Sequence, residues 1–144
     1  MPFAFEVYDH KRILMLHGRE EPPSADWNRY LDYLRPRNVA ELGLLAFTDG
    51  GAPNAAQRRA LNDVLQGRFF ARAVVNDSVL VRGVIAAVSW FAPGVKPFRP
   101  NEWRQAAAHA LFSADMLSDV TARLLAMNQR LRHPVPWMEY ALSK

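Results

Sequence analysis

The 144-residue chain contains no cysteine. This absence excludes disulfide frameworks, thiolate zinc sites, iron–sulfur clusters and cysteine nucleophiles, and it is typical of a reducing compartment. No stretch approaches the ~18 uninterrupted apolar residues of a membrane span, since Arg82 and Ser89 break even the run from 79 to 91. The first residues, Met1 to Glu6, lack the basic start of a signal peptide. We therefore expect a cytoplasmic protein without a transmembrane segment.

Sequence motifs of common catalytic centres are also missing. The sequence holds no GxSxG nucleophile elbow, no Gly-Lys-Ser/Thr phosphate loop and no GxGxxG fingerprint. Its four histidines are spread over different expected elements, without an i, i+4 pair. They are His10, His17, His109 and His133. We expect no metal, no cofactor and no enzymatic activity.

The composition indicates one folded domain that needs no disulfide or metal ion for stability. Half of the residues are hydrophobic and 22% are charged, and the length falls in the usual range for a single core. The net charge is +4, but a nucleic-acid-binding protein needs clustered basic residues. Because the arginines are spread along the chain, we predict a solvated basic surface and no nucleic-acid partner.

Hydrophobic periodicity predicts a hairpin followed by alternating helices and strands. Residues 3–8 alternate as a strand does, and the continuous apolar run 13–16 is typical of a strand covered on both faces. Further strands are expected at 42–47, 71–75 and 95–98, the last at a sheet edge because of Pro97. The order β-β-α-β-α-β-α-β-α predicts an α/β fold, with a mainly parallel sheet opened by an antiparallel hairpin and helices packed on it.

Two of the intervening helices are expected to bury apolar stripes. In the helix after residue 78, the inward residues are predicted to be Val81, Val84, Ile85 and Val88. In the helix after Pro100, the inward residues are predicted to be Trp103, Ala106, Ala107, Ala110 and Leu111.

The segment from residue 113 is expected to form an extra C-terminal helix. Its apolar residues are spaced 3, 4, 3, 4, like a short coiled-coil seam: Leu117, Val120, Leu124, Met127 and Leu131. The row either packs on its own domain or forms an interface with a second copy or another partner. We accordingly divide the chain into a domain at 1–112 and a helix and tail at 113–144.

The loop after the strand 42–47 is the first candidate site, because ligands and partners meet parallel sheets at the carboxyl ends of strands. It is followed by a helix whose N-terminus favours an anion. The candidate residues are Thr48, Asp49, Gly50, Gly51 and Asn54 in the loop, with Arg58 and Arg59 on the first helical turn. A plain strand-to-helix connection is the alternative.

The loop after the strand 71–75 is the second candidate. Asp77 and Ser78 lie in it, and Arg82 lies one turn into the next helix. These residues share the first loop's rim if the two strands are neighbours. The joined rim is then a predicted binding surface for a partner or an anion.

The hairpin-first order and the strand–loop–helix at residues 47–51 resemble the STAS family, the anti-sigma-factor antagonist-like domains. The resemblance covers residues 3–111. The stretches 49–59 and 89–91 are also similar to bacterial proteins of STAS-like type.

The resemblance implies a protein-binding regulatory module rather than an enzyme. In the antagonists, a hydroxyl in an Asp-Ser-Ser/Thr-Gly-like loop is phosphorylated by a partner kinase. Here Gly50 and Gly51 follow Asp49, and Thr48 precedes it, so the expected serine is missing. The leading hypothesis is a protein partner. The alternatives are a small-molecule or anion ligand at the Asp49–Asn54 loop, and a homodimer or larger assembly through the C-terminal helix.

Overall fold

The N-terminal hairpin forms as expected in the computed structural model, which describes residues 1–88 and 92–144. Strand β1 (Phe3–Asp9) pairs antiparallel with β2 (Arg12–His17), with Phe3 opposite His17. The continuous apolar run of β2 is buried because this strand lies between β1 and β3.

Three parallel strands complete a sheet of order β1-β2-β3-β4-β5. They are β3 (Gly43–Thr48), β4 (Ala71–Val75) and β5 (Val95–Phe98). Strand β5 forms one edge, as Pro97 predicts, since proline has no N–H to donate to a further strand. The predicted fold class, a mainly parallel sheet opened by an antiparallel hairpin, is confirmed.

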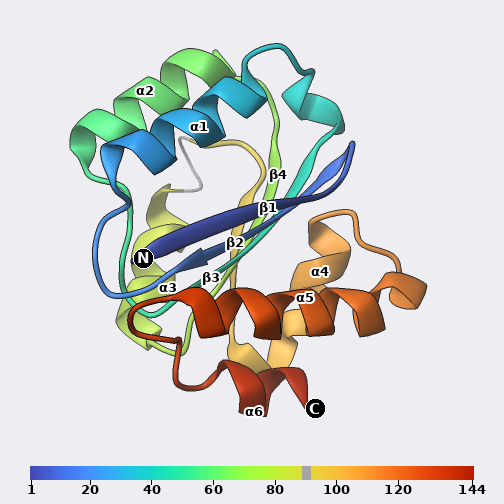
Figure 1. Cartoon of the computed structure of the whole chain (residues 1–144). Helices are drawn as coiled ribbons and strands as arrows, with labels where there is room; N and C mark the ends of the chain where they lie inside the picture. The colour runs from blue at the N-terminus through green and yellow to red at the C-terminus, as the bar shows by residue number, and fades with distance from the viewer. Residues whose placement is uncertain (89–91) are drawn as a thin grey trace.

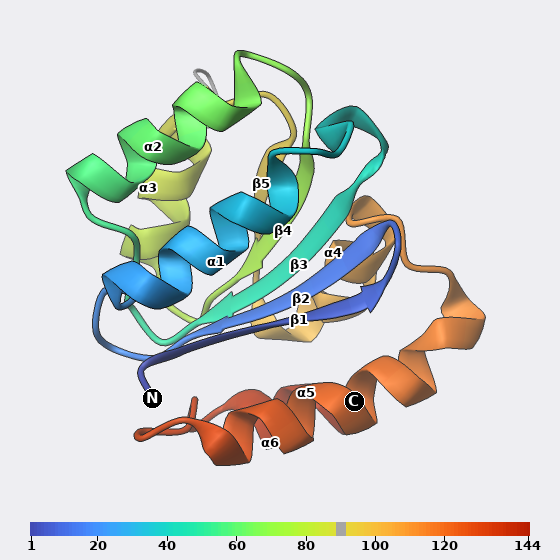
Figure 2. The ribbon, with the colours of Figure 1, turned by 45° about the horizontal axis from the view of Figure 1, so that its top comes forward.

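Helices cover both faces of the sheet (Figures 1 and 2). One side holds α1 (Ser24–Leu34), α2 (Ala55–Leu65) and α3 (Val79–Val88), and the other holds α4 (Trp103–His109), α5 (Leu117–Arg130) and α6 (Met138–Leu142). Short 3-10 turns precede β3, α4 and α5, at Val39–Glu41, Pro100–Glu102 and Ala114–Met116. Helix α6 was not predicted. None of the described helices is long and apolar enough to cross a membrane.

Alternation along the strands divides the interior into two apolar cores. Ile13 and Met15 face α1, where Trp27, Tyr30 and Leu31 are buried. Their neighbours in β2, Leu14 and Leu16, face the opposite core. That second core contains Trp103 of α4 and residues of α5 and α6.

The apolar row of α5 lies against the sheet of its own chain. Val120, Leu124 and Met127 are completely buried in the second core, and Leu131 is nearly so. On the exposed side, Arg130 and Arg123 lie 3.1 and 3.6 Å from the carboxylate of Glu6 in β1. Of the two predicted roles for this row, the structure displays packing on the domain itself for these four residues, while Leu117 is half-buried.

The prediction that Leu111 faces inward is wrong. The helix ends at His109, and Leu111 has a positive φ of 72° and is 42% exposed. The chain reverses at this point, and Phe112 enters the second core instead. The other predicted inward residues of α4 are buried.

Helix α3 departs most from the expected pattern. Val84, predicted to be inward, is 58% exposed, and Val81 and Ile85 are only half-buried. The helix packs mainly on β5, a four-residue edge strand, which is too narrow to cover it. The side chain of Val88 and the stretch 89–91, named in the resemblance, lie outside the described residues.

Candidate functional site

The two candidate loops meet at the carboxyl ends of β3 and β4, as predicted, because these strands are neighbours. Asn76, the residue after β4, is buried and joins them. Its side-chain amide donates to the backbone oxygen of Thr48 at 2.6 Å. Its side-chain oxygen accepts from the backbone N–H of Ser78 at 2.7 Å. Asn76 was not among the predicted site residues, although it directly follows a buried strand.

The hydroxyl of Thr48 holds the loop in shape. Thr48 is only 5% exposed, its Oγ1 donates to the carbonyl oxygen of Gly51 at 2.6 Å, and it accepts from the N–H of Gly50 at 3.1 Å. Gly50 has a φ of 110°, and a Cβ on Gly51 would lie 2.3 Å from the carbonyl oxygen of Glu20. The paired glycines therefore serve a tight turn, and the Thr48 hydroxyl is engaged inside it.

Asp49 is tied to the end of the hairpin. Its carboxylate lies 3.1 Å from the guanidinium of Arg19, and its N–H donates to the carbonyl of His17 at 3.0 Å. Arg19 belongs to this rim and was not among the predicted residues.

The N-terminus of α2 is closed by its own cap. Asn54 and Gln57 exchange hydrogen bonds in a capping box, and the Gln57 amide also donates to the carbonyl of Pro22 at 2.7 Å. Arg58 donates to the carbonyl of Pro53 at 2.8 Å, while Arg59 is exposed. The N–H of Gln57, which an anion at this terminus would use, is already bonded.

The second loop turns its polar groups toward the start of α3. Ser78 Oγ accepts from the N–H of Val81 at 3.3 Å, so Ser78 caps the helix. Arg82 donates through Nη1 to the carbonyl of Asn76 at 2.7 Å, and Asp77 is exposed. This hydrogen bond holds Arg82 at the rim through Nη1.

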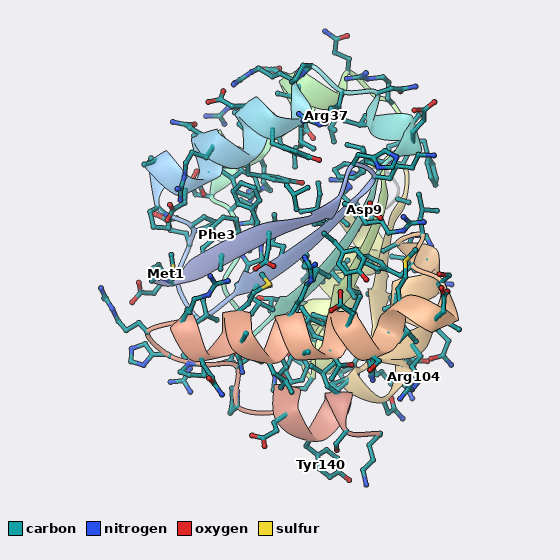
Figure 3. The ribbon with its side chains drawn as sticks, turned by 45° about the vertical axis from the view of Figure 1, so that its right-hand side comes forward. Met1, Phe3, Asp9, Arg37, Arg104 and Tyr140 are labelled. Carbon is teal, nitrogen blue, oxygen red and sulfur yellow. The ribbon has the colours of Figure 1, made fainter. Side chains whose placement is uncertain are left out.

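A cavity of about 290 Å³ opens beside this loop. Asp77 and Arg82 form one wall, and Arg99, Tyr140 and Lys144 come from the end of β5 and from the C-terminal segment. Figure 3 shows Tyr140 extending from α6 away from the body of the domain, and its side chain is 70% exposed. Arg99, Tyr140 and Lys144 were not predicted, because only the tertiary fold brings them to Arg82.

The outer face of α3 is apolar. Val79 and Leu80 are 76% and 79% exposed, and Val84 lies on the same side together with exposed Gly83 and Ala87. The only charged residue of the helix, Arg82, points to the rim instead. A globular domain normally places polar residues on such an arc, so this face is a candidate contact surface.

Basic residues outnumber acidic ones in the segment 54–99, which contains α3. Residues 54–99 contain seven of the 18 Lys and Arg residues but only two of the 14 Asp and Glu residues, which gives this segment +5. The rest of the chain, with 11 basic and 12 acidic residues, carries −1. The arginines are spread along the chain, but the acidic residues are scarce in this segment. Counting acids as well as arginines by segment would have revealed the asymmetry.

In the core beneath α1, three buried polar atoms have no hydrogen-bond partner among residues 1–88 and 92–144: His17 Nδ1, Tyr30 Oη and Arg72 Nη2. Burial lowers the pKa of His17 to about 4 and raises the pKa of Tyr30. It also lowers the pKa of Arg72. His17 ends β2 directly under the rim, so at neutral pH the rim rests on an uncharged imidazole.

The solved structures offer one likeness that bears on the fold. It is the structure of an uncharacterized protein of the DUF3478 family from Shewanella loihica PV-4, described as having a SpoIIAA-like fold. The TM-score is 0.54 with 16% sequence identity, and the match covers 75% of this chain and 91% of that chain. The chain thus has a SpoIIAA-like, STAS-like fold, as the resemblance implied. No family model and no curated protein matches the sequence.

Proposed function

We propose that this STAS-like domain is a non-enzymatic regulatory module that binds an acidic protein partner through α3 and the adjoining rim. The observation that carries the proposal is the exposed apolar face of α3, formed by Val79, Leu80 and Val84. The charge of the surrounding segment and the fold likeness support it.

The size of the apolar face suits the centre of a protein interface. Complete burial of three such side chains is worth roughly 1.5–3 kcal/mol each. A protein partner adds contacts to the polar rim around that centre, as interfaces usually do. A bilayer offers no such shape-matched contacts, and an apolar gain of this size is comparable to the marginal anchoring by one acyl chain.

The charge around α3 favours an acidic partner over a second copy. Two copies joined through α3 would bring together two segments with a net positive charge, and like charges oppose such an encounter. A partner with an apolar groove flanked by Asp and Glu residues matches both the apolar face and its surroundings.

A binding role also agrees with how the rim uses its polar groups. Thr48, Asn54 and Ser78 spend their side-chain oxygens on loop and cap hydrogen bonds. These oxygens shape a surface rather than face a reacting group. In this proposal the domain therefore acts by binding a partner.

The proposal is tested by site-specific photo-crosslinking in cells of the source organism. A benzophenone amino acid replaces Leu80, and a matched control replaces Leu111, which is also exposed but lies outside the basic segment. We expect one acidic protein to crosslink at position 80 and not at 111. The purified pair should then bind less tightly with L80S/V84S and with R58E/R59E, and at higher salt.

Three results would contradict this proposal. Equal crosslinking at both positions would remove α3 as the contact surface. Co-sedimentation of the purified chain with vesicles containing anionic phosphatidylglycerol, abolished by L80S/V84S, would assign α3 to a membrane. A concentration-dependent dimer in sedimentation equilibrium, lost in the same variant, would assign it to a second copy.

A further inference from the structure

We propose that the cavity at the carboxyl ends of β4 and β5 binds a small phosphate monoester through Arg82, Arg99 and Lys144. The inference does not rest on the proposed function, because its ligand is a small anion, although Asp77 and Arg82 of the rim also line this cavity.

Three separate segments build the cavity. Arg82 stands on the first turn of α3, Arg99 follows β5, and Tyr140 and Lys144 belong to the C-terminal segment. Arg104 of α4 donates to the carbonyl of Lys144 at 3.1 Å and so holds that segment against the domain. The three cationic side chains thus line one cavity although they come from separate parts of the chain.

The cationic side chains of this cavity form no ion pair among the described residues. Six other arginines form the ion pairs of the described residues, while Arg82, Arg99 and Lys144 form none within 1–88 and 92–144. One carboxylate, Asp77, lines the cavity with them. Three cationic side chains and one anionic side chain leave an excess of two positive charges, which matches a phosphate monoester with about −1.5 to −2 at neutral pH.

The guanidinium of Arg82 is held at the cavity by a hydrogen bond. Arg82 Nη1 is fixed by its 2.7 Å bond to the carbonyl of Asn76, which leaves its other N–H groups for a ligand. Glu102, the nearest acid after Arg99, accepts from the backbone N–H of Arg99 at 2.9 Å. Guanidinium groups bind phosphate oxygens in a two-pronged geometry, so two arginines can hold one phosphate from two sides.

The remaining walls suit a short organic group. Pro100 and Ala141 are apolar, and the Tyr140 ring carries the ammonium of Lys144 at 4.7 Å from its centre. The volume of about 290 Å³ is at the lower end of ligand sites. The cavity therefore fits a compact monoester with a flat or apolar body.

Calorimetric titration of the full chain with phenyl phosphate tests the inference, with benzoate as the singly charged comparison. We expect saturable binding of phenyl phosphate that is about tenfold tighter than that of benzoate and weakens at high salt. R99Q should weaken it about tenfold, since one charged donor pair is lost. R82Q should do the same, with R82K restoring part of the affinity.

The matched control is R58Q/R59Q, which removes two arginines beside the other helix N-terminus of the rim. Binding within twofold of the parent chain supports the cavity site. Loss of binding in this control, unchanged binding in R99Q, equal affinity for benzoate, or no saturable heat with phenyl phosphate would each overturn it. Circular dichroism of every variant at the titration temperature establishes that the compared proteins are folded.

Discussion

Helices α3 and α5 both carry apolar rows, but the row of α3 is exposed and the row of α5 is buried. In α5, Val120, Leu124 and Met127 are fully buried. In α3, Val79 and Leu80 are about three-quarters exposed. The difference lies in what stands opposite the row. Helix α5 presents polar residues such as Asp119 and Arg123 to water, whereas α3 has a single charged residue.

A hydrophobic stripe therefore predicts a buried face only where a polar face opposes it. In α5 the contrast fixes the orientation, because any rotation would bury charge. In α3 almost every rotation buries and exposes apolar atoms equally, so the pattern does not choose the inward side. The narrow edge strand β5 then decides how much of the helix is covered.

The largest expected effect on stability comes from a substitution in the buried row of α5. Leu124→Ala removes three heavy atoms from a fully buried position of α5 and leaves a cavity. We expect the free energy of unfolding to fall by about 2–5 kcal/mol. Chemical denaturation followed by circular dichroism measures it.

The same change on α3 is the control. Leu80→Ala removes equal atoms from a 79% exposed position, so we expect a change within about 0.5 kcal/mol. Comparable losses at both positions would contradict the contrast between the helices. A dimer in the parent chain that Leu124→Ala dissociates would show that the α5 row serves an interface after all.

Much of the fold was readable because local signals agreed with the long-range packing. The apolar run of β2 and Pro97 at the edge each predicted what the structure displays. Leu111 was misplaced because a positive φ at a chain reversal leaves no periodic trace.

Only part of the candidate site could be predicted from the sequence, for a related reason. Thr48 and Ser78 were found because they follow strands, and parallel strands end at one rim. Arg99 and Lys144 reach Arg82 only through the fold, since 45 residues separate the first two in sequence. Thr48 was also assigned to the surface, although its hydroxyl is spent inside the loop.

The burial of His17 can be tested through the pH dependence of stability. The core beneath α1 is sealed, and burial lowers the pKa of His17 from 6.5 to about 4. Between these values the unfolded chain binds a proton that the folded chain does not. Stability is therefore complete above about pH 6.5 and decreases as the pH falls toward 4, by about 3 kcal/mol in all.

Denaturation at several pH values tests this, with His17→Leu as the variant. The variant should lose the part of the pH dependence that lies between about 6.5 and 4. His10→Leu, in the exposed turn of the hairpin, should keep it. An imidazole of His17 that titrates near 6.5 by NMR would show that water reaches this core.

The smallest expected effect on stability comes from a substitution on the exposed face of α3. Gly83 lies in the middle of the exposed face of α3, and a Cβ there would meet no atom within 4 Å. Gly83→Ala should therefore stabilise the protein by about 0.5–1 kcal/mol, because alanine loses less backbone freedom in a helix. Ala87→Gly, also exposed on α3, should produce a loss of similar size. Thermal unfolding of the pair measures both. If Gly83→Ala destabilises the chain instead, the face of α3 is covered in solution, and the contrast with α5 disappears.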